Sequence, residues 1–145
     1  MNGAPLDILY VEDDDDHAEM TIRGLQDRHV GNTITRVADG EAALDYLFHR
    51  GSWRDAGRPY PHVVLLDLRL PKVDGIEVLR AIRSDPSLKR VPVVVLTTSD
   101  HERDIASAYD LHVNAYLVKP VEFTAFMDLM RDLGFFWLVW NRGPL

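Results

Sequence analysis

Cysteine is absent from the sequence, which excludes disulfide bonds, thiol catalysis and thiolate zinc sites together. Long apolar runs are also missing, since none approaches the ~18 residues that a membrane-spanning helix needs. Basic residues are in the minority: 16 Lys and Arg stand against 23 Asp and Glu, and the net charge of −7 argues against a nucleic-acid-binding surface. The first residues lack the basic and apolar stretches of a signal peptide. These absences predict a cytoplasmic protein that binds neither membrane nor nucleic acid.

The composition that remains is that of one globular domain. The 145 residues are 46% hydrophobic and 27% charged. A chain of this length buries enough surface to fold without disulfides or metals. We find no internal repeat and no low-complexity linker. The sequence therefore predicts one folded unit over residues 1–134 and an aromatic tail over residues 135–145.

Short apolar runs alternate five times with segments of helical periodicity. The apolar runs have the length of strands and cover residues 8–11, 63–68, 93–96 and 115–118, and a short β-branched segment at 33–37 completes the set. The helical segments cover residues 18–25, 43–48, 76–82, 105–109 and 123–133. This alternation predicts an α/β fold in which a doubly wound, five-stranded parallel sheet carries helices on both faces. In such sheets, functional groups gather beyond the carboxyl ends of the strands.

Four of the five predicted strands end in residues that can carry chemistry. Glu12 and Asp13 follow the first strand, and Asp67 lies in the third; Thr97 ends the fourth strand and Lys119 follows the fifth. A carboxylate in a buried strand is costly unless it is paired, bound to a metal or catalytic. Because the carboxyl ends of parallel strands meet at one edge, we expect these side chains to form one site. No glycine-rich turn follows the first strand, which excludes a dinucleotide-binding fold.

The carboxylates of Glu12, Asp13 and Asp67 would repel one another at such an edge. At about 4 Å and an effective dielectric constant of 20, each like-charged pair costs roughly 4 kcal/mol. A divalent cation removes that cost, and Mg²⁺ favours a few carboxylates with several waters. The three aspartates that follow, at positions 14–16, are better explained as the cap and first turn of a helix. None of the six histidines forms a recognisable metal pair, and surface positions explain them.

Asp67 is a candidate nucleophile. No helix follows it directly, and a capping role fits Asp74 better. A carboxylate can attack phosphorus and form an aspartyl-phosphate, provided that a metal and hydrogen-bond donors neutralise the phosphoryl oxygens. Thr97 and Lys119 would supply the donors. Each of these residues has an ordinary structural explanation when taken alone, so their combination carries the hypothesis.

The dipeptide Lys119-Pro120 adds a geometric expectation. An X-Pro bond adopts the cis form at low cost, and a cis bond would aim the lysine inward at the carboxylates. Pro120 is therefore a candidate cis-proline. Tyr116 has the strand parity to lie between core and surface, and an ordinary aromatic at the edge of the core also explains it.

In this order, the residues resemble the receiver domains of two-component response regulators. The resemblance covers residues 7–133. It is carried by Glu12-Asp13, by the segment Val-Leu-Leu-Asp-Leu-Arg-Leu-Pro-Lys-Val-Asp-Gly-Ile-Glu at 64–77, by Val-Val-Leu-Thr-Thr-Ser at 94–99 and by Ala-Tyr-Leu-Val-Lys-Pro at 115–120. It implies a flavodoxin-like (βα)5 fold with strand order 2-1-3-4-5.

The resemblance also implies how a phosphoryl group and a metal are bound. Asp67 would accept the phosphoryl group from a phosphohistidine on a sensor histidine kinase. Mg²⁺, or Mn²⁺, would be held by Asp13 and Asp67, by Glu12 through water and by the backbone carbonyl of Arg69. The protein would not be an enzyme beyond its own phosphotransfer and dephosphorylation.

The remaining site residues would transmit the signal. By resemblance, Lys119 binds a phosphoryl oxygen, while Thr97 and Tyr116 move on phosphorylation. Their movement would remodel the face formed by the fourth helix, the fifth strand and the fifth helix. The output would then pass through contact with another protein.

Two segments depart from the usual receiver pattern. The segment 48–61 is longer than the family usually has between the second helix and the third strand, and the tail is strongly aromatic. This combination resembles the stand-alone regulators paired with phytochrome-type light-sensing histidine kinases. The tail either folds back over its own domain or forms an interface. We expect a homodimer that uses the face of the fourth helix, fifth strand and fifth helix together with Phe135, Phe136, Trp137, Leu138 and Trp140.

Three other functions remain open. The protein could act as a phosphate sink that drains its kinase. It could be a metal-dependent phosphohydrolase with Asp67 as nucleophile, although such enzymes commonly need a second acid near the nucleophile, and Arg69 stands two positions after Asp67. A receiver-like module that binds a partner without phosphorylation is disfavoured by the intact set of acidic residues, threonine and lysine.

Overall fold

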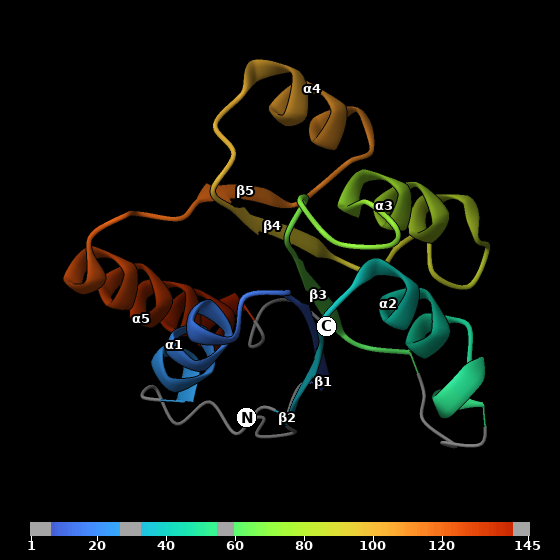
Figure 1. The fold of residues 1–145 in the computed structure, drawn as a ribbon, viewed down its shortest axis with the longest axis horizontal. Helices are drawn as coiled ribbons and strands as arrows, with labels where there is room; N and C mark the ends of the chain where they lie inside the picture. Colours follow the sequence, from blue (N-terminus) through green and yellow to red (C-terminus); the bar gives the residue numbers. More distant parts are fainter. Residues whose placement is uncertain (1–6, 27–32, 55–59, 141–145) are drawn as a thin grey trace.

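The computed structural model describes residues 7–26, 33–54 and 60–140, with the side chains of 130 and 133–140 left out. Strands and helices alternate through these residues (Figure 1). The strands are β1 (Asp7–Val11), β2 (Thr33–Val37), β3 (Val63–Leu66), β4 (Val93–Thr97) and β5 (Ala115–Val118). The helices are α1 (Asp15–Gln26), α2 (Gly40–Leu47), α3 (Gly75–Ser84), α4 (Glu102–Asp110) and α5 (Phe123–Trp140). The predicted alternation is confirmed.

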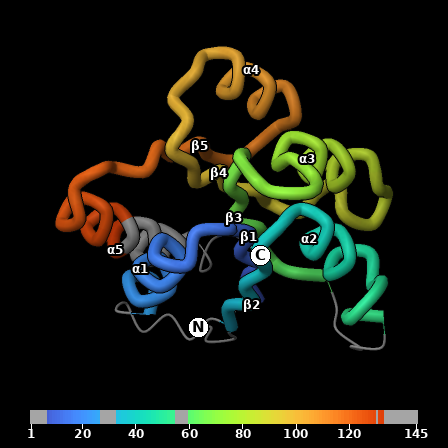
Figure 2. Tube along the Cα trace, viewed as in Figure 1, coloured from blue at the N-terminus to red at the C-terminus, as the bar shows by residue number. Residues whose placement is uncertain are grey.

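All strands pair in parallel, in the order β2-β1-β3-β4-β5. This is the order that the resemblance implied. Helices α1 and α5 pack together on one face of the sheet, and α2, α3 and α4 lie on the other (Figures 1 and 2). The sheet is thus the middle layer of three.

Two hydrophobic clusters hold these layers together, and the strands contribute alternate residues to each. Leu9 and Val11 join the cluster beneath α2 and α3, whereas Ile8 and Tyr10 join the cluster beneath α1 and α5. Because both faces of the central strands are covered, β3 and all of β1 after Asp7 are apolar and almost fully buried. On these strands, polar side chains can therefore be accommodated at the strand ends.

The two unusual segments have regular structure in part. The long segment after α2 contains the short helical turn η1 (Gly51–Trp53), and the Trp53 ring meets Tyr46 edge-on with 4.8 Å between centroids. Helix α5 runs on to Trp140, so the first six residues of the predicted tail continue this helix. The division of the chain at residue 134 stays a prediction. None of the helices described is long and apolar enough to cross a bilayer.

Candidate functional site

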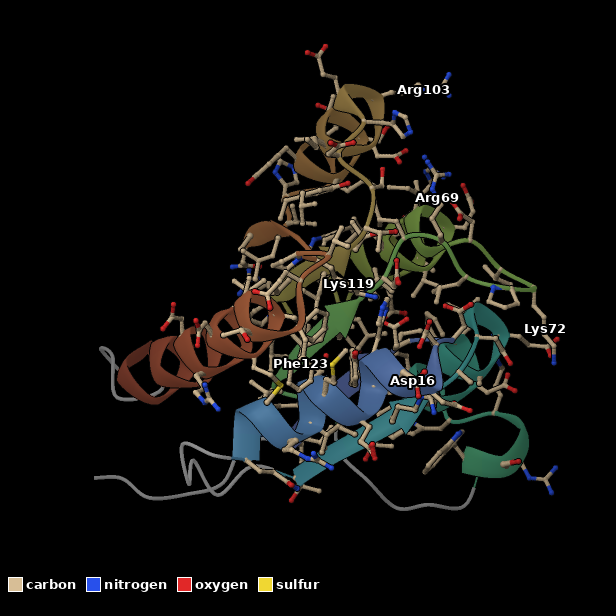
Figure 3. All side chains as sticks on the ribbon, turned by 60° about the vertical axis from the view of Figure 1, so that its left-hand side comes forward. Asp16, Arg69, Lys72, Arg103, Lys119 and Phe123 are labelled. Carbon is tan, nitrogen blue, oxygen red and sulfur yellow. The ribbon has the colours of Figure 1, made fainter. Side chains whose placement is uncertain are left out.

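The carboxyl ends of β1, β3 and β5 surround a polar pocket of about 200 Å³. The pocket is lined by Glu12, Asp13, Asp14, His17, Asp67, Arg69, Thr98 and Lys119. Lys119 lies in the interior at the strand ends, whereas Arg103 on α4 lies on the outside of the molecule (Figure 3). The structure therefore brings together the strand-end carboxylates and the lysine that the sequence singled out.

Three of the lining carboxylates lie close enough to share one ion. Glu12, Asp13 and Asp67 each offer an oxygen, and these oxygens lie within 4.8 Å of one another. Glu12 and Asp67 are buried, while Asp13 is exposed and leaves the site open to solvent. Carboxylate oxygens in such a cluster are the ligands that a hard divalent cation such as Mg²⁺ prefers. The donor set therefore fits the predicted metal.

Asp67 is fixed by the strand before it and the loop after it. Its backbone N–H donates to the carbonyl of Val11 at 3.1 Å, which extends the pairing of β3 with β1. Its Oδ1 accepts from the backbone N–H of Arg69 at 3.1 Å, so Oδ2 is the oxygen that faces Lys119. Gly75 lies against this loop, because a Cβ there would come 2.3 Å from the carbonyl oxygen of Asp67.

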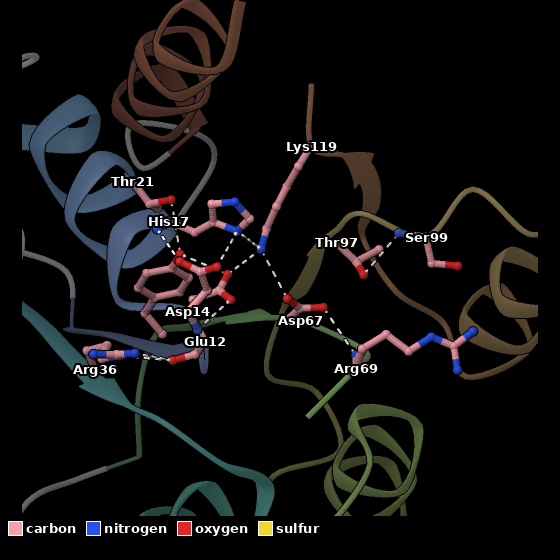
Figure 4. Close-up of polar contacts among 11 residues, drawn as sticks. Glu12, Asp14, His17, Thr21, Arg36, Asp67, Arg69, Thr97, Ser99 and Lys119 are labelled. Atoms are coloured by element: carbon pink, nitrogen blue, oxygen red, sulfur yellow. Dashed lines mark hydrogen bonds and ion pairs between the residues drawn. The ribbon is translucent and has the colours of Figure 1, made fainter. Parts of the chain in front are cut away.

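Lys119 reaches the carboxylates from β5. Its backbone N–H donates to the carbonyl of Thr97 at 2.7 Å, and its side chain is 2% exposed. The ammonium donates to Oε1 of Glu12 and, at 3.0 Å, to Oδ2 of Asp67 (Figure 4). A buried ammonium is tolerated when it is paired and hydrogen-bonded in this way. Here one cation offsets part of the charge of two buried acids.

The prediction of a cis peptide bond before Pro120 is wrong. No peptide bond in the described residues is cis. The lysine turns inward without it, because the backbone of Lys119 continues the ladder between β4 and β5 and so stays in line with the strand. The strand geometry alone directs the ammonium to the site.

Burial dominates the electrostatics of Glu12. It raises the pKa of this carboxyl to about 7, against the hydrogen bond and charge of Lys119, which lower it. The Tyr10 hydroxyl donates to Glu12 at 3.3 Å, and burial raises the pKa of Tyr10 as well. Burial therefore favours the protonated form of Glu12, whereas a bound cation would favour its charged form.

Thr97 and Tyr116 meet at Ser99 rather than at the pocket. Thr97 is fully buried, and its hydroxyl oxygen accepts from the Ser99 backbone N–H at 3.3 Å. The Tyr116 hydroxyl donates to the Ser99 carbonyl at 2.9 Å, and burial raises the pKa of this tyrosine. The next residue along, Thr98, lines the pocket instead. The two predicted switch residues thus share one partner in the segment between β4 and α4.

Arg69 connects the site to α4. Its backbone N–H contacts Asp67, but its guanidinium donates to Asp104, which also accepts from the Ser99 hydroxyl. The sequence drew attention to the Arg69 carbonyl alone. Ser99 stood in the motif that carried the resemblance but was given no role, and Asp104 carried no pattern that would have revealed it, because Arg69 and Ser99 lie outside α4.

Arg36 is a further residue that the sequence did not reveal. From β2, its guanidinium donates twice to the backbone carbonyl of Glu12, at 2.9 and 2.6 Å, and once to Asp15 at 2.9 Å. It therefore holds the turn between β1 and α1 from the side opposite Lys119. In the sequence it is one polar residue in a short alternating strand.

The turn between β1 and α1, which carries the acidic residues 12–16, agrees with the expectation from the sequence in part. Asp14 caps α1, since its Oδ1 accepts from the backbone N–H of His17 at 3.0 Å. This hydrogen bond is the main cause that lowers the pKa of Asp14. His17 is partly exposed, and its ring also lines the pocket with Nδ1 3.1 Å from the Lys119 ammonium, a contact that the sequence did not reveal.

Comparison of the sequence and the structure with those of known proteins identifies the family. The model of the response regulator receiver domain matches residues 8–131. The chain belongs to this family. The resemblance read from the strand-end residues is confirmed.

Three relatives match over nearly their whole length. The chain is 46% identical over 141 residues to the probable methanogenesis regulatory protein FilR2 of Methanothrix harundinacea (strain 6Ac), covering 97% of this chain and 88% of FilR2. It is 40% identical over 137 residues to response regulator Rcp1 of Synechocystis sp. (strain ATCC 27184 / PCC 6803 / Kazusa), covering 94% and 92%. The Mn²⁺-bound structure of Rcp1 superposes with a TM-score of 0.89, at 38% identity and 97% and 99% coverage. The phosphorylated cyanobacterial phytochrome response regulator RcpA superposes with a TM-score of 0.87, at 41% identity and 93% and 95% coverage.

Proposed function

We propose that this protein accepts a phosphoryl group on Asp67 from a sensor histidine kinase and signals by changing its protein-contact surface. The observation that carries the proposal is the position of Asp67, which is buried between the Lys119 ammonium at 3.0 Å and two further carboxylates within 4.8 Å. Transfer of a phosphoryl group is catalysed mainly by positioning and by charge neutralisation. A cation on one side of Asp67 and an ammonium on the other would supply that neutralisation.

The proposed transfer starts from a phosphohistidine of the kinase. Oδ2 of Asp67 attacks phosphorus, the new O–P bond forms as the P–N bond breaks, and the histidine ring leaves with the electron pair. Asp13, Asp67, the Arg69 carbonyl and, through water, Glu12 would hold Mg²⁺, which would neutralise charge on the phosphoryl oxygens. After the transfer, the Lys119 ammonium would donate a hydrogen bond to one of the phosphoryl oxygens. The manganese-bound form of Rcp1 supports a divalent metal in this fold.

A phytochrome-type sensor kinase is the partner class that we propose, with the protein acting in the cytoplasm. The support is the likeness to RcpA, which is described as a phytochrome response regulator. FilR2 is described differently, as a methanogenesis regulator. Phosphotransfer from a purified phytochrome-type kinase can be compared with phosphotransfer from a purified kinase of a methanogenesis system. The cognate kinase is expected to transfer its phosphoryl group fastest.

We further propose a homodimer through the α4–β5–α5 face, meaning the exposed apolar side chains of Tyr109, Val118, Val121 and Phe123. All four are at least 41% exposed, and Val121 is fully exposed. Exposed apolar side chains on these elements are what a dimer interface would bury. The tail residues 135–140 would extend it from the same helix, although their side chains lie outside those described.

The test of the central proposal is labelling by a small phosphodonor. Incubation with acetyl phosphate and Mg²⁺ should produce a hydroxylamine-sensitive phosphoprotein, and Asp67→Asn should abolish it. Asp74→Asn is the matched control, because Asp74 lies in the same loop but at the start of α3. Labelling that persists in Asp67→Asn would overturn the assignment.

A phosphate sink uses the same chemistry and differs only in the fate of the signal after transfer. The phosphohydrolase has less support. The second acid that it needs is not at position 69, where arginine stands and pairs with Asp104. A sink predicts that phosphorylation leaves the α4–β5–α5 face and the oligomeric state unchanged, whereas the proposed switch predicts that both change.

A further inference from the structure

The Lys119 ammonium is held from three directions. It has three N–H donors and no acceptor. Two donors meet Glu12 and Asp67, and the third side faces Nδ1 of His17 at 3.1 Å (Figure 4). His17 comes from the first turn of α1, so its contact with Lys119 joins residues 102 positions apart.

We propose that His17 is a positioning residue for Lys119. Its Nδ1 accepts the third N–H of the ammonium, so that another N–H stays directed at Asp67 and, after transfer, at a phosphoryl oxygen. This inference rests on the proposed phosphorylation of Asp67. It assigns a role to a side chain that lines the pocket but has no part in binding the metal.

The ring is held so that Nδ1 meets the lysine. The backbone N–H of His17 bonds to Asp14, and the imidazole lies against the Phe126 ring of α5, with 5.7 Å between centroids and a tilt of 31°. The Asp14 carboxylate oxygen nearest to Nδ1 lies 4.0 Å away, beyond hydrogen-bond distance. Since the ammonium can only donate, Nδ1 carries the lone pair and the neutral ring has its proton on Nε2.

A neutral acceptor suits this place better than a charged one. A third carboxylate would compete with the phosphoryl group for the ammonium, while a protonated imidazole would put two positive charges 3.1 Å apart. An apolar side chain would leave one N–H of a buried ammonium without a partner and free the ammonium to shift toward Glu12. Neutral His17 avoids all three.

Two variants separate the acceptor from the packing of the ring. In His17→Asn, the amide oxygen is bonded to Cγ as Nδ1 is, so it can replace the acceptor but not the contact with Phe126. In His17→Leu, the contact with Phe126 remains and the acceptor is lost. We expect His17→Leu to label with acetyl phosphate about tenfold more slowly than wild type at saturating Mg²⁺, the factor typical of one hydrogen bond to a charged group, and His17→Asn to stay within about twofold.

The outcomes are distinct. Wild-type labelling in His17→Leu would overturn the positioning role while leaving the proposed function intact. Equal slowing in both variants would show that the ring, and not its acceptor, matters, and would also overturn the inference. If wild type itself is not labelled, the proposed function fails first. Thermal unfolding of both variants identifies any slowing that comes from loss of fold.

A spectroscopic measurement tests the hydrogen bond without any kinetics. The ¹⁵N chemical shifts of the His17 ring at pH 8 report which nitrogen carries the proton. We expect an unprotonated Nδ1 that accepts a hydrogen bond and a protonated Nε2. A neutral ring with its proton on Nδ1 would overturn the proposal.

Discussion

Folded proteins usually bury apolar side chains and expose charged ones. The strand-end pocket instead buries charged side chains, and the α4–β5–α5 face exposes apolar ones. In the pocket, Glu12, Asp67 and Lys119 are charged and buried, whereas on the face Val121 and Phe123 are apolar and exposed. The buried charges find their partners within the chain, at 3.0 Å in the case of Asp67 and Lys119. In the proposed dimer, the exposed apolar groups would find theirs on a second copy of the chain. The contacts of the pocket can therefore be explained within this chain alone, whereas the proposed role of the face depends on a second molecule.

Ser99 is the point at which the two regions meet. Its backbone binds both Thr97 and Tyr116, and its hydroxyl binds Asp104 of α4. A change of charge at Asp67 that draws Thr97 toward the pocket would break one of these bonds. Substitutions at four positions separate the two regions, and their expected effects decrease from the pocket to the face.

Removing the ammonium should have the largest effect. Lys119→Met leaves Glu12 and Asp67 facing each other without their shared cation and removes a donor to the phosphoryl group. We expect labelling by acetyl phosphate to fall about 100-fold, as when one preorganised donor is removed from an active site. Lys89→Met, which changes an exposed lysine, is the control. Equal rates in the two variants would show that Lys119 takes no part in the transfer.

Glu12 should make the stability of the metal-free protein depend on pH. Because burial raises its pKa to about 7, its contribution is fully present below the unfolded-state pKa near 4.5 and is lost as pH rises through 7, by up to about 3 kcal/mol. Mg²⁺ should restore stability at pH 8, since it favours the carboxylate. Urea unfolding at pH 5 and 8 measures this. Glu12→Gln cannot ionise, so an identical pH dependence in that variant would contradict the explanation.

Releasing the acidic turn should have a smaller effect. Arg36→Gln removes a charged donor with two bonds to the Glu12 carbonyl, and we expect a loss of about 2 kcal/mol in unfolding free energy with weaker binding of Mg²⁺. The control is Arg23→Gln, because the Arg23 side chain is 66% exposed and its pair with Glu19 is worth little. A stable Arg36→Gln with normal metal affinity would mean that the turn holds its shape by itself.

The smallest effect on the monomer should come from the apolar face. Phe123→Ser changes an exposed side chain, so the unfolding free energy should move by less than about 0.5 kcal/mol. The dimer should nevertheless weaken by about tenfold or more in sedimentation velocity, while Phe123→Leu retains it. A chain ending at Gly134 tests the tail in the same way. A wild-type protein that sediments as a monomer would reject the dimer itself.

The sequence predicted those features that depend on local pattern and on strand ends. The apolar runs located the central strands because both faces of the sheet are covered there, and the position of Asp67 near the end of such a run marked the edge where the site lies. The clustering of Glu12, Asp13 and Asp67 could be inferred from the same argument, because β1 and β3 are neighbours in the sheet.

The rest depended on contacts between distant residues. His17 was assigned to the surface because nothing near it in the sequence reveals Lys119, and the importance of Arg36 depends on a carbonyl 24 positions away. The cis bond at Pro120 was inferred from a low energetic cost, but strand pairing alone orients the lysine. The helix beyond residue 134 was missed because an apolar run has no periodicity that separates a helix from a tail.

The central claim is that Asp67 itself becomes the acyl phosphate. Borohydride reduces an aspartyl-phosphate to homoserine, and mass spectrometry of the digested protein then identifies the modified residue directly. After incubation with acetyl phosphate and Mg²⁺, the account predicts homoserine at position 67 and nowhere else, with none formed when Mg²⁺ is chelated. Homoserine at position 13, hydroxynorvaline (the reduction product of a glutamyl-phosphate) at position 12, or an unmodified residue 67 in a labelled protein would contradict it.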